Sequence, residues 1–274
     1  VESVKGMSLH DLQDNLLEDH PSVGEYGDIA YLILATSALM QGKLPNQRGM
    51  IDMDKRAMVS RWDSMVTGVS RMAGFLESQR IFDRQRLPTG AVLPVLAALF
   101  TIIPEDGDEL GQADRLLRKY MWSSFFTDRY ENAQTSKILA DFTALRNTLN
   151  GIEKPDGTRF AETDVPALDR DQHPIADEAE LLSAGWPQQM NVIGRSILAV
   201  ANYLGAQDLA DGQTVTRDHL KKREYHHLFP DALLKEAGVQ SYLALNCALV
   251  TRKTNRTIGR KALSAEFGWI KRCS

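Results

Sequence analysis

Apolar residues recur at three- and four-residue intervals through much of the first 150 positions, which is the spacing of helices with one buried face. The clearest run starts at Asp54 and continues to Gln79. Its apolar face consists of Met58, Trp62, Met65, Val69, Met72 and Leu76. We expect a single helix here, with the Met and Trp side chains in a hydrophobic core rather than in a cofactor site.

Further helices are predicted on both sides of that run. Asp28 suits the start of a helix, which Gly42 and Pro45 then end. The longest apolar run, 91–103, has only 13 residues, so it is too short to cross a bilayer and predicts a buried helix. The helical periodicity returns within 113–130, 135–150 and 194–208.

The periodicity is lost between residues 151 and 185, where Pro, Gly and acidic residues gather. Such a composition is typical of a long loop. His173 lies in this segment beside Pro174, and we expect it to be a solvated loop residue.

The C-terminal part of the chain has a different pattern. Residues 245–251 are apolar enough for a strand, and residues 255–267 can form a helix. The predicted fold is therefore mainly α. It consists of a helical domain, residues 1–205, followed by a small module of two strands and a helix, residues 206–274.

Composition narrows the class of protein. With 43% hydrophobic and 25% charged residues, the chain has the make-up of a folded globular protein. The two cysteines, Cys247 and Cys273, have no metal-ligand spacing, and we expect free thiols in a reducing cytoplasm. No signal peptide or membrane segment is expected. A start at Val1 without methionine suggests a piece of a longer chain.

The net charge of −4 conceals an asymmetry. Residues 217–274 hold 12 Lys and Arg against 5 Asp and Glu, a balance of +7, whereas the other 216 residues hold 20 against 31, a balance of −11. A basic segment on an acidic body fits a surface for a polyanion, although charge alone fits a solvated basic face equally well.

Within the basic segment, His226 and His227 stand side by side in the stretch EYHHLFP. A neutral imidazole is a natural general base for taking a proton from water. A second imidazole and an amide oxygen can hold a divalent cation and leave positions open for water and phosphate oxygens. Two asparagines follow, Asn246 and Asn255. Positive potential for an anion would come from Arg252, Lys253, Arg256 and Arg260.

Simpler interpretations of the same residues stay open. Asn255 can cap its helix and Asn246 can be a turn residue. The histidines can form a zinc site, although the cysteines are misplaced for one. Adjacent residues of a regular strand also point to opposite faces, so His226 and His227 share one site only if the pleat breaks near them.

The order His-His-Leu-Phe-Pro, then Asn246 and nine residues later Asn255, resembles the HNH (ββα-metal) endonuclease motif. More narrowly, the chain is similar to the C-terminal half of GmrSD-type modification-dependent restriction enzymes and of the SspE phage-defence nickases. The similarity is strongest from Tyr225 to Lys261 and covers most of the chain. The nucleotide-binding half of such proteins would precede this chain and would be its partner.

This resemblance implies a role for each residue. His227 would activate water, His226 and Asn255 would ligate the metal, and Asn246 would support the site through backbone hydrogen bonds. HNH nucleases of the RNA-guided type carry Asp where this chain has His226, so Mg²⁺ is a less strict choice here. Mn²⁺ would serve equally, and Ni²⁺ or Zn²⁺ is compatible.

The implied function is a DNA endonuclease, by default a nickase, of a bacterial anti-phage restriction system. Two alternatives stay open: a catalytically silent DNA-binding or regulatory module that docks the nucleotide-binding half, and a nuclease that cuts RNA. The sequence does not determine the modification recognised, the nucleotide dependence or the oligomeric state.

Overall fold

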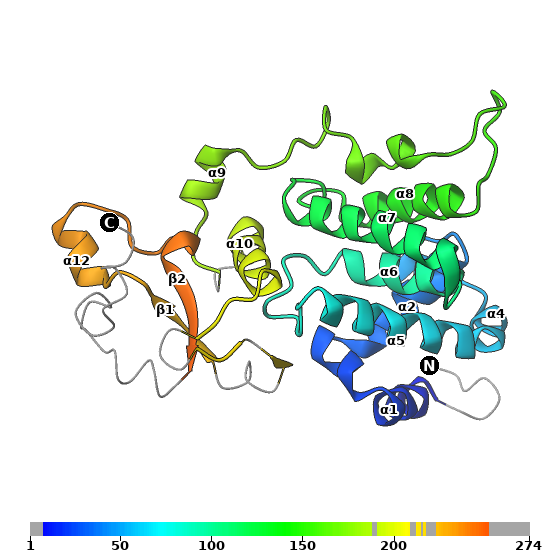
Figure 1. Ribbon diagram of the computed structural model, residues 1–274. Helices are drawn as coiled ribbons and strands as arrows, with labels where there is room; N and C mark the ends of the chain where they lie inside the picture. The colour runs from blue at the N-terminus through cyan, green and yellow to red at the C-terminus, as the bar shows by residue number, and fades with distance from the viewer. Residues whose placement is uncertain (1–7, 188–190, 209–211, 215, 218–222, 252–274) are drawn as a thin grey trace. The chain divides into compact units, whose positions relative to one another are not determined.

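The structure is a computed structural model, and it describes all residues except 1–7, 188–190, 209–211, 215, 218–222 and 252–274. The described chain is mainly helical, with one two-stranded sheet, as the sequence predicts (Figure 1). The helices are α1 Leu9–Asp19, α2 Ile29–Met40, α3 Gln47–Ile51, α4 Lys55–Ser60, α5 Trp62–Ser78, α6 Val92–Phe100, α7 Gly107–Phe125, α8 Gln134–Leu149, α9 Glu178–Ser183, α10 Val192–Tyr203 and α12 Asp231–Glu236. The strands are β1 Arg223–His227 and β2 Cys247–Thr251.

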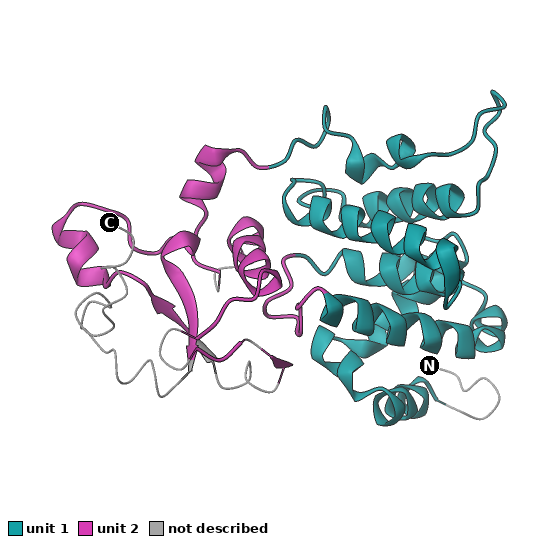
Figure 2. Ribbon diagram, viewed as in Figure 1, with its two compact units in different colours: residues 1–78, 89–175 teal, residues 79–88, 176–274 magenta. Residues whose placement is uncertain are grey.

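The chain forms two compact units, coloured in Figure 2. Unit 1 comprises residues 1–78 and 89–175, and unit 2 comprises residues 79–88 and 176–274. This division does not coincide with the boundary predicted after residue 205. The physical reason is packing: Phe82 and Leu198, both upstream of the predicted boundary, form small apolar clusters with residues of β1 and β2.

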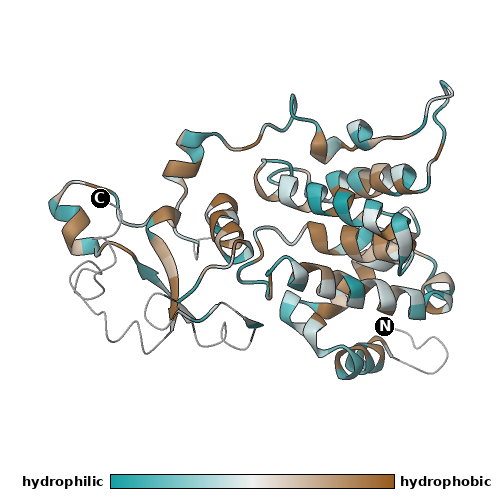
Figure 3. Cartoon of the chain, viewed as in Figure 1, coloured by the Kyte–Doolittle hydropathy of each residue, from teal (hydrophilic) through white to brown (hydrophobic). Residues whose placement is uncertain are grey.

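Unit 1 is organised around α6, whose residues are all buried and which is strongly hydrophobic in Figure 3. It packs against α2, α5 and α8. The α5–α6 contact is so close that a Cβ at Gly68 would lie 2.4 Å from the carbonyl oxygen of Ala97, so only glycine fits there. The buried helix predicted from the apolar run is thereby confirmed. In the part of the chain that the structure describes, no helix is long and apolar enough to cross a membrane.

Local capping chemistry fixes the helix starts. The Asp28 carboxylate accepts a hydrogen bond from the Tyr31 N–H, and Asp54 accepts bonds from two N–H groups of α4. The single helix predicted from Asp54 is wrong, because α4 ends at Ser60 and α5 starts at Trp62. Side-chain bonds tie the α4 region to the end of α2: Gln41 to the Asp54 backbone, and the Arg61 guanidinium to the Met40 carbonyl.

The predicted loop between 151 and 185 holds two short 3-10 turns and then α9. The expectation that His173 is solvated is wrong, because only 8% of it is exposed. Its Nδ1 lies 2.7 Å from an Asp128 carboxylate oxygen, and its Nε2 lies 3.1 Å from an Arg129 guanidinium nitrogen. The loop folds back onto α7 and α8, and this contact buries the imidazole.

Candidate functional site

The two histidines stand at the end of β1 in unit 2. β1 pairs antiparallel with β2, with His226 opposite Ala248 and His227 opposite Cys247. The ladder of paired residues runs regularly through both histidines, so the break in the pleat that would bring them to one face is absent between them. Their side chains therefore leave the strand on opposite faces. The strand ends immediately after His227. A substrate that meets both imidazoles must therefore reach around the end of the strand.

On its own face of the sheet, His227 lies between two aromatic rings. The Trp186 ring stacks on the imidazole, with ring centroids 4.4 Å apart and planes 29° apart. Tyr242 meets the imidazole edge-on, with centroids 4.8 Å apart and planes 87° apart. Trp186 and Tyr242 also contact each other, at 5.6 Å between centroids. His227 is thus enclosed on more than one side while it remains partly exposed.

A short backbone pairing brings Trp186 to the sheet. The Ala244 N–H donates to the Ala184 carbonyl oxygen at 2.8 Å, and Gly185 forms an antiparallel bridge with Leu243. The N-terminus of α10 crosses this segment closely: a Cβ at Gly194 would lie 2.3 Å from the carbonyl oxygen of Gly185. Glycine at position 194 therefore allows the Trp186 segment to lie beside the hairpin.

Burial determines the acid–base properties of His227. Desolvation lowers the pKa of its imidazole, the Asp231 carboxylate raises it, and the neighbouring His226 lowers it, with a net shift below the ordinary value of 6.5. The ring is therefore neutral at neutral pH. Its Nε2 is buried and has no hydrogen-bond partner among the residues that the structure describes, an uncommon state for a buried polar atom.

Asn246 fixes the turn that follows His227. Its side-chain oxygen accepts the Phe229 N–H at 2.7 Å, and its amide nitrogen donates to the carbonyl oxygens of Phe229 at 3.1 Å and Ser241 at 2.9 Å. Its own carbonyl oxygen accepts the Leu228 N–H at 2.8 Å. Only 7% of Asn246 is exposed, so these bonds form away from water. The residue joins both ends of the 228–246 segment.

Asn246→Ala should expose this role through amide hydrogen exchange. Without the side-chain oxygen the Phe229 N–H loses its acceptor, which we expect to cost about 1–3 kcal/mol of stability and to speed exchange at that amide. Asn246→Asp separates the two halves of this role, because it keeps the acceptor for the Phe229 N–H but loses the donors to the Phe229 and Ser241 carbonyl oxygens. Equal exchange at Phe229 in the wild type and the alanine variant would contradict this assignment.

The described residues include one of the two predicted metal ligands. His226 offers one imidazole, while Asn255 lies outside the described residues, as do Arg252, Lys253, Arg256, Arg260 and the predicted helix 255–267. Among the side chains that the structure does describe, no group of three or more His, Cys, Asp and Glu could hold an ion. Cys247 offers no thiolate, because burial raises its pKa to about 12. The His226 imidazole suits an open site completed by further residues and by water.

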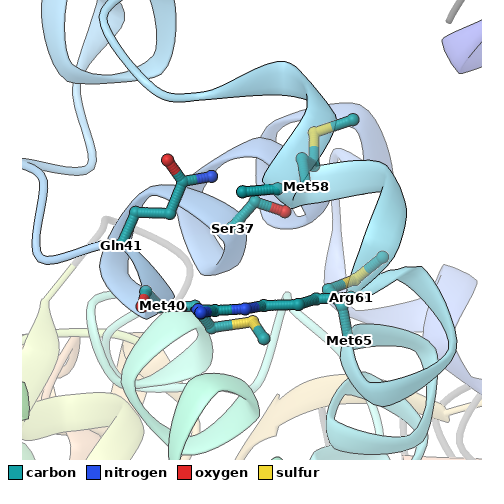
Figure 4. Close-up of a pocket in the computed structure, with 7 residues that line it drawn as sticks. Ser37, Met40, Gln41, Met58, Arg61 and Met65 are labelled. Atoms are coloured by element: carbon teal, nitrogen blue, oxygen red, sulfur yellow. Dashed lines mark hydrogen bonds between the residues drawn. The ribbon is translucent and has the colours of Figure 1, made fainter.

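A pocket in unit 1 provides no competing site (Figure 4). It lies between α2, α4 and α5 and is lined by Ser37, Met40, Gln41, Ala57, Met58, Arg61 and Met65. Two of its polar side chains are already engaged, since Gln41 bonds the Asp54 backbone and Arg61 bonds the Met40 carbonyl. Met65 is buried in the helix packing, as the sequence predicts, whereas Met58, also predicted for the core, is only half-buried.

Sequence reasoning missed Trp186 and Tyr242. Trp186 stands 41 positions before His227, in a stretch without periodicity. The pairing of residues 184–185 with 243–244 brings it to the imidazole. Two local signals could have pointed to Trp186. It directly follows Gly185, and Gly194 lets the start of α10 approach that segment closely.

Comparison with known proteins adds little to this geometry. No protein-family model matches the chain. It is 21% identical over 249 residues to an uncharacterized protein of Methanocaldococcus jannaschii, a match that covers 86% of this chain and 39% of that protein. The chain thus spans about two-fifths of the length of this relative. At that identity an uncharacterized relative assigns no activity, and function rests on the chemistry of the site itself.

Proposed function

We propose that the chain is a metal-dependent DNA endonuclease that cuts one strand per event, with His227 as the general base. The observation that carries the proposal is a partly buried imidazole, with its pKa lowered by burial, at the end of a strand whose preceding residue, His226, carries a second imidazole on the opposite face. A neutral imidazole is the form that accepts a proton from water. The resemblance to GmrSD-type restriction enzymes supports DNA as the substrate and phage defence as the setting.

In the proposed reaction, water attacks phosphorus while the His227 ring accepts one of its protons. Because Nε2 is enclosed, we assign this role to Nδ1. The bond from phosphorus to the 3′ oxygen breaks, that oxygen takes a proton from solvent, and a 5′-phosphate and a 3′-hydroxyl result. Asn246 would keep the base and the following turn in register.

A divalent ion, when bound, would polarise the phosphate and stabilise charge on the leaving oxygen. His226 would hold it together with Asn255, and imidazole ligation favours Mn²⁺ or Ni²⁺ at least as well as Mg²⁺. Phosphate contacts are assigned to Arg252, Lys253, Arg256 and Arg260 on the basis of charge.

The direct test is incubation of the chain with supercoiled plasmid in the presence of Mg²⁺, Mn²⁺ or Ni²⁺. We expect nicked circles before any linear product, because a single site cuts one strand per event. His226→Ala should weaken Mn²⁺ binding in calorimetric titration and abolish most nicking. His10→Ala makes the same chemical change at an exposed histidine on α1 and should nick like the wild type.

Each outcome has a definite meaning. An intact plasmid with all three metals, together with DNA binding, would replace the nuclease by a silent binding module. Cleavage of single-stranded RNA but not of DNA would keep the chemistry and change the substrate. Normal nicking by His226→Ala would remove that residue from the metal site.

A further inference from the structure

We infer that Trp186 and Tyr242 are positioning residues that together fix the plane of the His227 ring for proton transfer. The catalytic consequence rests on the proposed function. The geometric part, that these rings hold the imidazole in one orientation, stands on the contacts of unit 2 alone.

The first step is that no side chain or backbone group described in the structure orients this imidazole by a hydrogen bond to its Nε2. Rotation about the bond that joins a histidine ring to its Cβ is broad, so a general base needs something to hold its ring. In many enzymes a carboxylate or carbonyl oxygen bonds the second ring nitrogen and does so. Within the described residues, the Nε2 of His227 has no such partner.

The second step is that the two aromatic rings restrict this rotation. Trp186 lies nearly parallel to the imidazole at 4.4 Å, and Tyr242 lies nearly perpendicular to it at 4.8 Å. A rotation of the imidazole out of its plane would lose the stack and push the ring into one of its neighbours. Such aromatic pairs are worth about 0.5–1.5 kcal/mol each beyond the area that they bury.

The third step is that Trp186 is buried and packed, while Tyr242, 47% exposed, is positioned by its contact with Trp186 and by its backbone. Trp186 is only 6% exposed, and it also meets Tyr225 edge-on, at 6.5 Å between centroids. Gly185 and Leu243 form a β-bridge; Trp186 directly follows Gly185, and Tyr242 directly precedes Leu243. The backbone that carries one ring is therefore paired with the backbone that carries the other, and the spacing between the rings is set by this pairing.

A matched series of variants tests the inference in the full chain. Trp186→Leu keeps an apolar side chain but removes the stack, and Trp186→Phe keeps a ring. We expect the leucine variant to lower kcat for plasmid nicking by roughly 10–100-fold at nearly unchanged KM, since a small misplacement of a reacting group has effects of this order. The phenylalanine variant should recover most of the loss. Trp62→Leu, on α5, is the control and should leave nicking unchanged.

Nuclear magnetic resonance reports the position of the His227 ring independently of nuclease activity. The stacked indole should shift the His227 ring protons upfield, and these signals are assigned by their loss in His227→Ala. Trp186→Leu should return them toward ordinary values, Trp186→Phe should keep part of the shift, and Tyr242→Leu should broaden or split them. Unshifted His227 signals in the wild type would overturn the inference, whatever the activity.

The two readouts separate this inference from the proposed function. If the wild type does not nick but the ring signals respond as expected, Trp186 and Tyr242 do orient the imidazole and the nuclease proposal fails. If the wild type nicks and Trp186→Leu has an unchanged kcat, the positioning role is wrong. Melting temperatures of all variants identify any loss of activity that comes from unfolding. If Trp186→Leu is unfolded, the kcat and ring-proton shifts of Trp186→Phe test the inference instead.

Discussion

The His227→Ala variant should bind DNA and divalent metal as the wild type does, yet nick plasmid about 10²–10⁴-fold more slowly. That range is the usual contribution of a general base. Alanine removes the proton acceptor and leaves His226 and the backbone ladder in place. Single-turnover nicking measured beside metal titration and DNA binding distinguishes a lost base from a lost ligand.

The pH dependence follows from the same imidazole. Burial lowers the pKa of His227, so the proton-accepting form already predominates below the ordinary value of 6.5. The nicking rate of the wild type should therefore rise with pH through a value below 6.5 and then level off. An inflection well above 6.5 would assign the rate-limiting ionisation to another group.

Comparison with His226→Ala distinguishes which of the two histidines is the general base. If His227→Ala nicks normally while His226→Ala is inactive, the roles of the two imidazoles are reversed. If both variants nick like the wild type, the histidine pair is not the active site.

The second large effect concerns stability, and it lies in unit 1. Asp141→Ala should lower the free energy of unfolding by about 3–5 kcal/mol, because it leaves a buried guanidinium without its counter-charge. The Asp141 carboxylate is fully buried and binds Arg129 through two hydrogen bonds, of 3.0 and 2.9 Å. It also accepts the Tyr130 hydroxyl at 2.7 Å and the Ala167 N–H at 3.1 Å.

The Asp141 cluster also anchors the long loop. Ala167 is part of the loop, and His173 contacts Arg129, so removal of the carboxylate should free the 151–175 segment to proteases. Glu162→Ala is the control, because its ion pair with Lys119 is exposed and should contribute less than about 1 kcal/mol. Urea denaturation with limited proteolysis checks both effects. A loss below about 1 kcal/mol for Asp141→Ala would mean that water or other groups replace the carboxylate.

Structural features that depend on near neighbours in the chain were predictable. Asp28 caps α2, as predicted, because a carboxylate accepts the free N–H groups of the next few residues. The apolar run became the buried helix α6, and residues 247–251 became β2. The histidine pair was found for a similar reason, since two adjacent imidazoles serve no ordinary purpose in a strand. The predicted partners of the pair after residue 251 lie outside the described residues and stay predictions.

What the chain alone determined, then, is its mainly helical character, its strongest helices and the chemical character of the histidine pair. Tertiary structure decided which residues surround that chemistry. Trp186 reaches His227 through pairing of backbone segments about 60 positions apart in sequence, and Phe82 joins unit 2 through contact with Leu249. His173 is buried because its loop returns to an Arg–Asp pair. Such contacts depend on packing between segments distant in sequence, and no local pattern records which segments will meet.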